Sequence, residues 1–206
     1  IGIVKELKDD SHAEEVKQML NDALSVSINL LDSTIMDLNS ILKVKNIIDE
    51  RKEKIVFSEL IENIHHSIKN LMNKEKATIK VDFQEINEHV TLKSYMQSIF
   101  FNLISNSIKY RQADIAPLIT IKSSLHNGNL VLTYQDNGMG IDMAKKGDQV
   151  FGLYKRFHNH VEGKGMGLFM VKTHVETLGG KIAISSEVNK GTTFRLFFPL
   201  INLSND

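Results

Sequence analysis

The chain has 206 residues, of which 42% are hydrophobic, so it can bury a substantial core in one large domain or two small ones. Lys plus Arg and Asp plus Glu both number 25, and this balance argues against nucleic acid as a partner. The absence of cysteine excludes a disulfide framework and thiolate zinc sites, and it fits a reducing cytoplasm.

The apolar runs of the chain are much shorter than the ~20 residues that a membrane-spanning helix needs. We therefore expect no membrane contact by this chain. It begins at Ile1 rather than Met, and no signal-peptide pattern follows. We expect a piece of a longer protein that is cytoplasmic, with the cytoplasmic part of a membrane-anchored sensor as one option.

Residues 1–45 are predicted to form a helical hairpin. Two apolar rows repeat with the heptad spacing of a coiled-coil seam, Leu24, Leu31 and Leu38 in one and Ile28, Ile35 and Leu42 in the other. An isolated hairpin would leave this apolar face in water, so we expect a homodimer through a four-helix bundle. The alternative is a hairpin that packs on its own globular domain.

A second domain is predicted at residues 55–206, after a charged linker at residues 46–54. Strands are predicted at 54–57, 77–83, 118–125, 130–136, 181–188 and 192–200, and helices at 59–72, 92–110 and 166–180. Ser58 is predicted to be a helix N-cap, and Asn127-Gly128 a hairpin turn. The segment Ile141–Glu162 is predicted to be a mobile loop with little structure. This order predicts an α+β fold, a two-layer α/β sandwich that follows the hairpin.

Two glycine-rich segments, DNGMGID from Asp136 and EGKGMGL from Glu162, match neither a P-loop nor a dinucleotide-binding turn. Glycines let a backbone approach a ligand closely, and the helix that opens near Met166 offers free N–H groups to phosphate. The Asp136 carboxylate only accepts hydrogen bonds, so it suits the amino group of adenine and repels the carbonyl of guanine. The pattern predicts a site that selects ATP over GTP.

Three polar residues, Asn102, Asn106 and Lys109, share one face of the long predicted helix. An asparagine oxygen is a hard ligand that suits Mg²⁺, and a lysine can hold phosphate as a point charge. The alternative for such a stripe is a solvated helix face.

Four segments in this order, NLISNSIKY, DNGMGI, VFGLYKRF and GKGMGLFMV, resemble the N, G1, F and G2 boxes of a known family. They are similar to the GHKL-type ATP-binding domain of sensor histidine kinases, which is shared more widely with gyrase and mismatch-repair enzymes. The resemblance covers about residues 50–200, and residues 1–45 resemble the dimerisation and histidine-phosphotransfer hairpin that precedes this domain. It implies a protein-histidine kinase that uses ATP and Mg²⁺ and passes the phosphoryl group to an aspartate in a response-regulator receiver domain.

The resemblance also implies residue roles. Asn106 would bind Mg²⁺ with support from Asn102, Tyr110 would flank the base, and the catalytic residues would be Asn106, Lys109 and Arg156, with Arg156 nearest the γ-phosphate. The glycines of the G2 segment would hinge the lid over the site, and Tyr154 belongs to the F box. Nucleotide contacts are implied for Asn102, Asn106, Lys109, Tyr110, Asp136, Gly138, Gly140, Phe151, Gly163, Gly165, Met166, Gly167, Leu168 and Thr193, with Thr192 as the alternative to Thr193.

One feature of the family is missing from this sequence. The family's phosphate acceptor is a histidine on the first hairpin helix, followed by an acidic residue and then a proline, and no such motif occurs. His12 lies in a predicted turn, so we expect the acceptor to precede Ile1. Three alternatives follow: a nucleotide-binding pseudokinase scaffold, a GHKL serine kinase and a conformational ATPase. A metal or nuclease site at His158 and His160 is disfavoured, because the other ligands of such sites are missing.

Overall fold

The computed structural model describes residues 51–155 and 165–200. The chain divides into two units, Ile1–Asn46 and Ile47–Asp206, and all described residues belong to the second unit. The predicted hairpin of residues 1–45 and most of the predicted linker lie outside the described residues, so the hairpin and the domain boundaries stay predictions.

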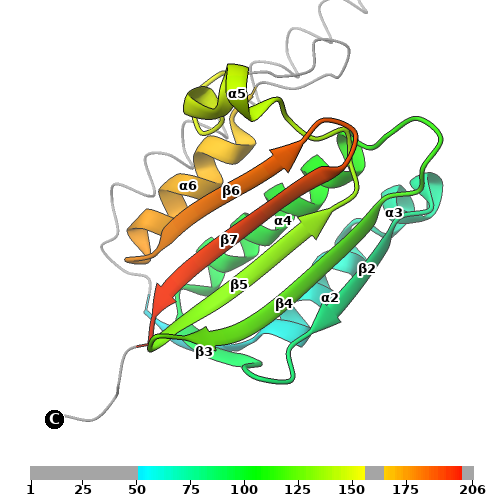
Figure 1. Ribbon diagram of the computed structural model, residues 1–206. Coiled ribbons are helices and arrows are strands. Elements are labelled where there is room, and N and C mark those ends of the chain that lie inside the picture. The colour runs from blue at the N-terminus through cyan, green and yellow to red at the C-terminus, as the bar shows by residue number, and fades with distance from the viewer. Residues whose placement is uncertain (1–50, 156–164, 201–206) are drawn as a thin grey trace, which may run out of the picture. The chain divides into compact units, whose positions relative to one another are not determined.

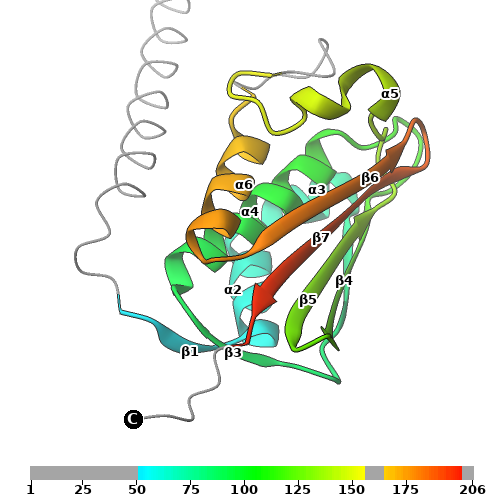
Figure 2. The same cartoon turned by 60° about the vertical axis from the view of Figure 1, so that its left-hand side comes forward.

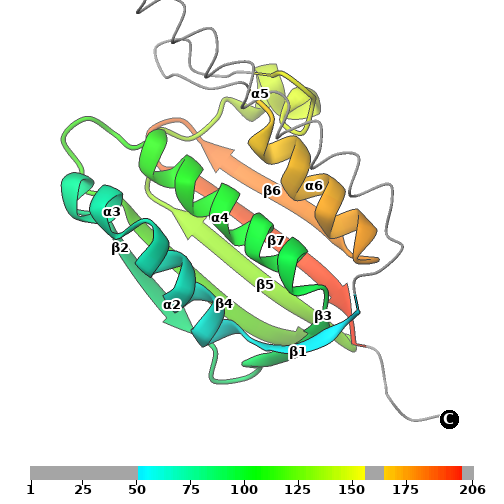
Figure 3. The same ribbon diagram turned by 180° about the vertical axis from the view of Figure 1, so that it is seen from behind.

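The second unit has an α+β fold, as predicted, with a sheet in one layer and helices in the other (Figure 1). A view turned by 60° shows the two layers from the side (Figure 2), and the view from behind shows α2, α4 and α6 over one face of the sheet (Figure 3). In chain order the described elements are β1 (Glu53–Val56), α2 (Phe57–Ser67), α3 (Lys69–Glu75), β2 (Thr78–Asp82), β3 (Glu88–Thr91), α4 (Lys93–Lys109), β4 (Leu118–His126), β5 (Asn129–Asp136), α5 (Met143–Lys146), η1 (Gly147–Gln149), α6 (Gly167–Thr177), β6 (Lys181–Glu187) and β7 (Gly191–Pro199).

The main sheet has five strands in the order β2-β4-β5-β7-β6. β2 runs parallel to β4, and the other neighbours are antiparallel. The β4–β5 hairpin turns at Asn127 and Gly128, whose φ angles of 50° and 74° are those that a tight two-residue hairpin turn requires. The predicted hairpin turn is therefore confirmed, and it sets the register that brings Asp136 opposite Ile119.

The core lies between α4 and the inward face of the sheet. Because successive strand residues point to opposite faces, every second residue of β5 and β7 is inward, and these residues include Leu132, Tyr134, Phe194, Leu196 and Phe198. The side of α4 that meets them is fully buried and consists of Met96, Ile99, Phe100, Leu103, Ile104 and Ile108. This packing holds α4 firmly, and with it the polar residues on its adjoining face.

The first helix of the unit differs from its prediction. Instead of one helix at residues 59–72, α2 and α3 are separated at Ile68, which has φ −114° and ψ 18°. Ser58 is not an N-cap: α2 begins at Phe57, and the Ser58 amide donates to Asn87 Oδ1 at 3.0 Å. Because Asn87 lies 29 residues further along the chain, local sequence could not reveal this partner.

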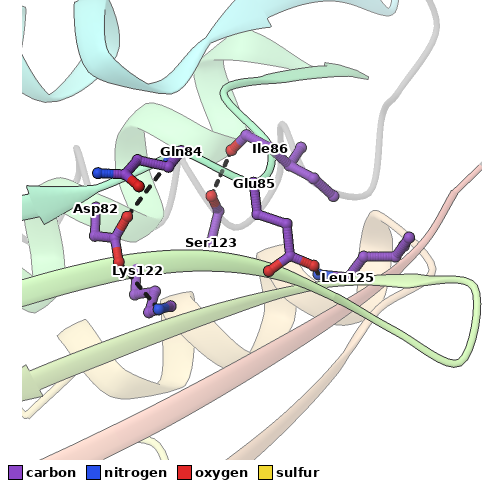
Figure 4. A network of polar contacts seen from close by, with 7 residues as sticks. All are labelled: Asp82, Gln84, Glu85, Ile86, Lys122, Ser123 and Leu125. Carbon is purple, nitrogen blue, oxygen red and sulfur yellow. Dashed lines mark hydrogen bonds and ion pairs between the residues drawn. The ribbon is translucent and has the colours of Figure 1, made fainter.

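The connection between β2 and β3 is held against β4 by polar contacts (Figure 4). Asp82 pairs with Lys122 at 3.0 Å, and Leu125 N donates to Glu85 Oε1 at 2.7 Å. Ser123 Oγ donates to the carbonyl of Ile86. The connection leads into β3, a short strand that the sequence analysis missed and that pairs antiparallel with β1.

The segment after β5 is more ordered than predicted. The expectation of a structure-poor loop is wrong for its first part, which forms α5 and η1. The Asp142 side chain caps α5 by accepting from Lys145 N at 3.2 Å, a local interaction that favours a helical turn. Residues 156–164 lie outside the described residues. Among the described helices, none has the length and apolar character needed to cross a membrane.

Candidate functional site

The predicted site residues within the described part of the chain gather at one end of the sandwich. The C-terminal ends of α4 and β5 lie there together with the N-terminal ends of α6 and β7 (Figure 1). α4 contributes Asn102 and Asn106, β5 contributes Asp136, and α6 begins at Gly167. The fold therefore brings together segments that are far apart in the sequence.

Asp136 ends β5 and is half-buried. Its Oδ1 accepts from Gly138 N at 2.9 Å and from Thr192 N at 3.2 Å, and its Oδ2 accepts from Ser107 Oγ at 2.9 Å. Burial raises the pKa of Asp136 above its ordinary value, although these three hydrogen bonds act in the opposite direction. A carboxylate offers about four acceptor positions, so one position remains on Oδ2.

The glycine loop after Asp136 is packed tightly on the end of α4. Met139 N donates to the carbonyl of Tyr110 at 2.9 Å, and a Cβ at Gly138 would lie 2.8 Å from the same carbonyl oxygen. Gly140 has φ +64°, and a side chain there would overlap the backbone of Glu187. Both glycines are therefore required by this close approach of three backbone segments.

Asn102 and Asn106 face the beginning of α6. A Cβ at Gly167 would lie 3.1 Å from Asn102 Oδ1 and 3.2 Å from Asn106 Nδ2. Asn102 Nδ2 donates to the carbonyl of Ser98 at 2.8 Å, which turns its oxygen toward Gly167. The two amides thus lie beside the first turn of α6, where free backbone N–H groups attract negative charge.

Lys109 is the last residue of α4, and Tyr110 is its C-cap. The Lys109 ammonium lies 5.4 Å from the centre of the Tyr110 ring, a cation–π contact. Both side chains are half-buried. Lys109 thus adds positive charge at the end of α4, on the same helix as the two asparagines.

The F-box and G2 residues are described in part. Phe151 and Leu168 pack against the core, and Met166 is the N-cap of α6. Gly165 has φ +70° and lies against the backbone of Lys155. The F box and the G2 segment are therefore in contact at these two residues. Tyr154 is 54% exposed. Arg156 and Gly163 lie outside the described residues, as do His158 and His160.

Thr192 rather than Thr193 is the residue beside Asp136. Thr192 and Asp136 are register partners, and Thr192 N donates to the Asp136 carboxylate. Since side chains alternate along β7, Thr193 points to the opposite face of the sheet. Nucleotide contact by Thr193 remains a sequence prediction, and the geometry favours its stated alternative.

Sequence reasoning missed three residues that build this site: Ser107, Ser186 and Gly191. Ser186 Oγ accepts from Ile141 N at 2.8 Å and contacts Thr192 Oγ1 at 2.8 Å. Gly191 has φ +101° and lies against the Asp136 backbone. The segment NKG before β7 was a turn signal for Gly191, but nothing local marks the two serines.

The model of the histidine kinase-, DNA gyrase B- and HSP90-like ATPase family matches residues 91–202, more than half of the chain. The chain belongs to this family. The matched region runs from the end of β3 beyond β7, so it contains the complete group of described site residues. Membership confirms the resemblance seen in the four sequence boxes.

Two curated relatives of this ATPase-family chain illustrate its kinship. It is 27% identical over 192 residues to the phytochrome-like protein Cph1 of Synechocystis sp., covering 92% of this chain and 25% of Cph1. It is 26% identical over 188 residues to the signal transduction histidine-protein kinase ArlS of Staphylococcus aureus, covering 87% of this chain and 41% of ArlS. The chain therefore spans less than half the length of either relative.

Solved structures, a histidine kinase among them, share the fold. The Acinetobacter baumannii histidine kinase AdeS matches with a TM-score of 0.70 at 20% identity, covering 89% of this chain and 85% of AdeS. Full-length ShkA in complex with AMPPNP matches with a TM-score of 0.67 at 16% identity, covering 82% of this chain and 36% of ShkA. At these identities the likeness is one of fold.

Proposed function

We propose that this chain is the catalytic core of a sensor histidine kinase. It would bind ATP with Mg²⁺ and transfer the γ-phosphoryl group to a histidine. In that step a bond forms between the histidine nitrogen and the γ-phosphorus, the bond from this phosphorus to the β–γ bridging oxygen breaks, and ADP leaves. The phosphoryl group would then pass to an aspartate in the receiver domain of a response regulator.

The observation that carries the proposal is the free acceptor position on Asp136. Three donors hold the carboxylate in place and leave part of Oδ2 for a further donor. The exocyclic amino group of adenine supplies such a donor, whereas guanine would present a carbonyl oxygen. We assign this position to the adenine base, with Tyr110 beside it and Gly138 and Gly140 shaping the loop.

The phosphate end of the nucleotide is assigned to the first turn of α6 and the amides of α4 beside it. The absence of a side chain at Gly167 lets this turn pack closely against Asn102 and Asn106, so its N–H groups and both amides border one position. The α6 N-terminus would attract the phosphates, and Lys109 would add a point charge. Mg²⁺ suits the Asn106 oxygen together with phosphate oxygens, and it would neutralise the charge of the transferred group. Arg156, Phe151 and the G2 glycines are proposed to complete the site as a lid.

The parts of the proposal outside the described residues rest on the sequence. The heptad rows of residues 1–45 support a homodimer, and the family supports the response-regulator partner. Because ATP and response regulators are found in the cytoplasm, we place this part of the protein there. The histidine that accepts the phosphoryl group is not assigned to a residue of this chain.

Two measurements test the proposal. Calorimetric titration of the chain should show that ADP binds in the presence of Mg²⁺ and that GDP binds much more weakly. Incubation with γ-labelled ATP should leave this chain unlabelled, because no acceptor histidine is assigned to it, and should place an acid-labile, base-stable label on a histidine of a protein extended at its N-terminus. Equal binding of ADP and GDP would contradict the base assignment. ATP binding without a histidine label on either protein would favour the pseudokinase scaffold, and steady release of inorganic phosphate would favour a conformational ATPase.

A further inference from the structure

Two buried hydroxyl groups, those of Ser107 and Tyr134, form a hydrogen-bonded series that ends at Asp136. Ser107 of α4 is 4% exposed, and Tyr134 of β5 is 0% exposed. Ser107 Oγ lies 2.8 Å from the Tyr134 hydroxyl oxygen and 2.9 Å from Asp136 Oδ2. The series therefore leads from Tyr134 in the interior of the sandwich to Asp136 Oδ2, the oxygen that has a free acceptor position.

The direction of the hydrogen bonds in this series follows from the number of hydrogens that each group can donate. The Ser107 hydroxyl has one hydrogen and three oxygen neighbours. The third neighbour is the Leu103 carbonyl at 3.1 Å, which already accepts from the Ser107 backbone amide in the helix and does not need the hydroxyl hydrogen. An ionised carboxylate cannot donate, so Ser107 donates to Asp136. Ser107 must then accept from Tyr134, whose hydroxyl uses its own hydrogen in doing so.

The reverse direction requires a proton on Asp136. Asp136 would then donate to Ser107 through Oδ2, and the remaining position on Oδ2 would belong to a neutral acid, which is a weaker acceptor than a carboxylate. Burial raises the pKa of Asp136, so this reversal is less costly here than at an exposed aspartate. Burial also raises the pKa of Tyr134 well above its ordinary value, so the phenol keeps its proton and remains a donor to Ser107.

We propose that Ser107 and Tyr134 are positioning residues that keep Asp136 an acceptor and aim the remaining position on Oδ2 at the amino group of the base. This inference rests on the proposed nucleotide site and adds to it two residues that determine specificity. Neither residue contacts the base itself. Ser107 acts directly on the carboxylate, and Tyr134 acts only through Ser107.

The test uses Ser107→Ala, Tyr134→Phe and the double variant, with calorimetric titration of ADP and IDP. IDP differs from ADP at the base, where a carbonyl replaces the amino group. Ser107→Ala should weaken ADP binding about tenfold, the effect of one lost hydrogen bond to a charged group, and should narrow the preference for ADP over IDP. Tyr134→Phe should act in the same direction but less strongly. In the double variant it should add nothing to Ser107→Ala, because its effect passes through Ser107.

Ser123→Ala is the matched control. Ser123 is also a buried serine whose hydroxyl donates a hydrogen bond, but its acceptor is the carbonyl of Ile86, and it lies on β4 rather than beside Asp136. Its removal should lower the melting temperature and leave both nucleotide affinities unchanged. If Ser107→Ala fails to fold, Tyr134→Phe carries the test, because it keeps the ring that packs near Phe194.

The pH dependence of ADP binding separates positioning from simple packing. Loss of the Ser107 donor should raise the pKa of Asp136 further, so that Ser107→Ala loses ADP affinity at a higher pH than the wild type. If both variants keep the wild-type ratio of ADP to IDP affinity and the wild-type pH profile, the inference is overturned while the proposed function stands. If the wild type itself fails to bind ADP, the proposed function and the inference are both overturned.

Discussion

Asp136 is the residue that would separate adenine from guanine. Replacing it with Asn keeps the size but substitutes an NH₂ donor for one carboxylate oxygen, which disturbs the bonds with Ser107, Gly138 and Thr192. We expect Asp136→Asn to weaken ADP binding by about 1–3 kcal/mol in calorimetric titration. Unchanged affinity in the variant would place the base elsewhere. Thr193→Val tests the sequence prediction for Thr193, and it should bind ADP normally if Thr192, on the same sheet face as Asp136, is the contact instead.

The raised pKa of Asp136 predicts a pH dependence of binding. Burial raises this pKa, and a bound amino group favours the ionised carboxylate, so ADP affinity should be full well above the raised pKa and should fall as the pH drops through it. The fall should therefore begin at a higher pH than for an ordinary aspartate. Titrations between about pH 8 and about pH 4.5 would measure it. Asp136→Asn corrects for the titration of the nucleotide phosphates, and identical profiles in the two proteins would refute the prediction.

Asn106 is the proposed magnesium ligand. Asn106→Ala removes the amide oxygen, whereas Asn106→Asp keeps an oxygen in the same place and adds a negative charge. Mg²⁺ should strengthen ATP binding in the wild type and in Asn106→Asp, and this effect should be lost in Asn106→Ala. ATP titrations with Mg²⁺ and with a chelator measure the effect. Equal strengthening by Mg²⁺ in the Ala variant would show that the metal is held without Asn106.

At the level of elements, the site depends on how closely α6 approaches α4. Gly167→Ala would place a methyl group 3.1 Å from Asn102 Oδ1 and 3.2 Å from Asn106 Nδ2, so it would displace the amides that are assigned to the phosphate end of the nucleotide. Alanine favours the helix more than glycine does by about 1 kcal/mol, so stability should change little while ATP affinity falls. Calorimetry together with thermal unfolding separates the two effects.

Gly147→Ala is the matched control for Gly167→Ala. Its methyl group would lie 3.4 Å from Met143 Cε, an ordinary contact with a flexible side chain outside the α4–α6 contact. It should leave ATP affinity unchanged. If Gly167→Ala also binds ATP with wild-type affinity, the phosphates do not depend on the contact between Gly167 and the two asparagines.

At the level of the whole molecule, the hairpin and the ATP site should be separable. Leu31 and Leu38 belong to the same heptad row, so Leu31→Glu together with Leu38→Glu should place charges in the seam and convert a dimer into monomers. Light scattering would measure this change, and ADP binding should persist because the site lies in the second unit. Both leucines lie outside the described residues, so the prediction rests on the sequence alone.

Ser33→Glu together with Ser40→Glu is the control for the seam variant. These serines have the same seven-residue separation but lie off both apolar rows, so their replacement should leave the dimer intact. A wild-type chain that is monomeric would contradict the four-helix bundle and would favour a hairpin that packs on its own domain.

The sequence by itself determined the class of fold and the candidate residues of the main site. Periods of apolar residues predicted α4, β4, β5, α6, β6 and β7, because burial on one face imposes a spacing of about 3.6 residues on a helix and of 2 on a strand. Asp136, Asn102 and Asn106 could be found because the four boxes keep their chemistry within short segments. The break at Ile68 and the strand β3 escaped prediction because both depend on packing with distant residues.

Only the tertiary structure decided which groups surround Asp136. Ser107 is 29 residues from Asp136 and Thr192 is 56, so their hydrogen bonds depend on the packing of α4 on β5 and on the register of β5 with β7. That register also separates Thr192 from Thr193, because a shift of one residue along a strand turns a side chain to the opposite face. Local sequence gives the chemical type of each side chain. Contacts between distant segments set the direction in which that side chain points and the hydrogen bonds that it accepts.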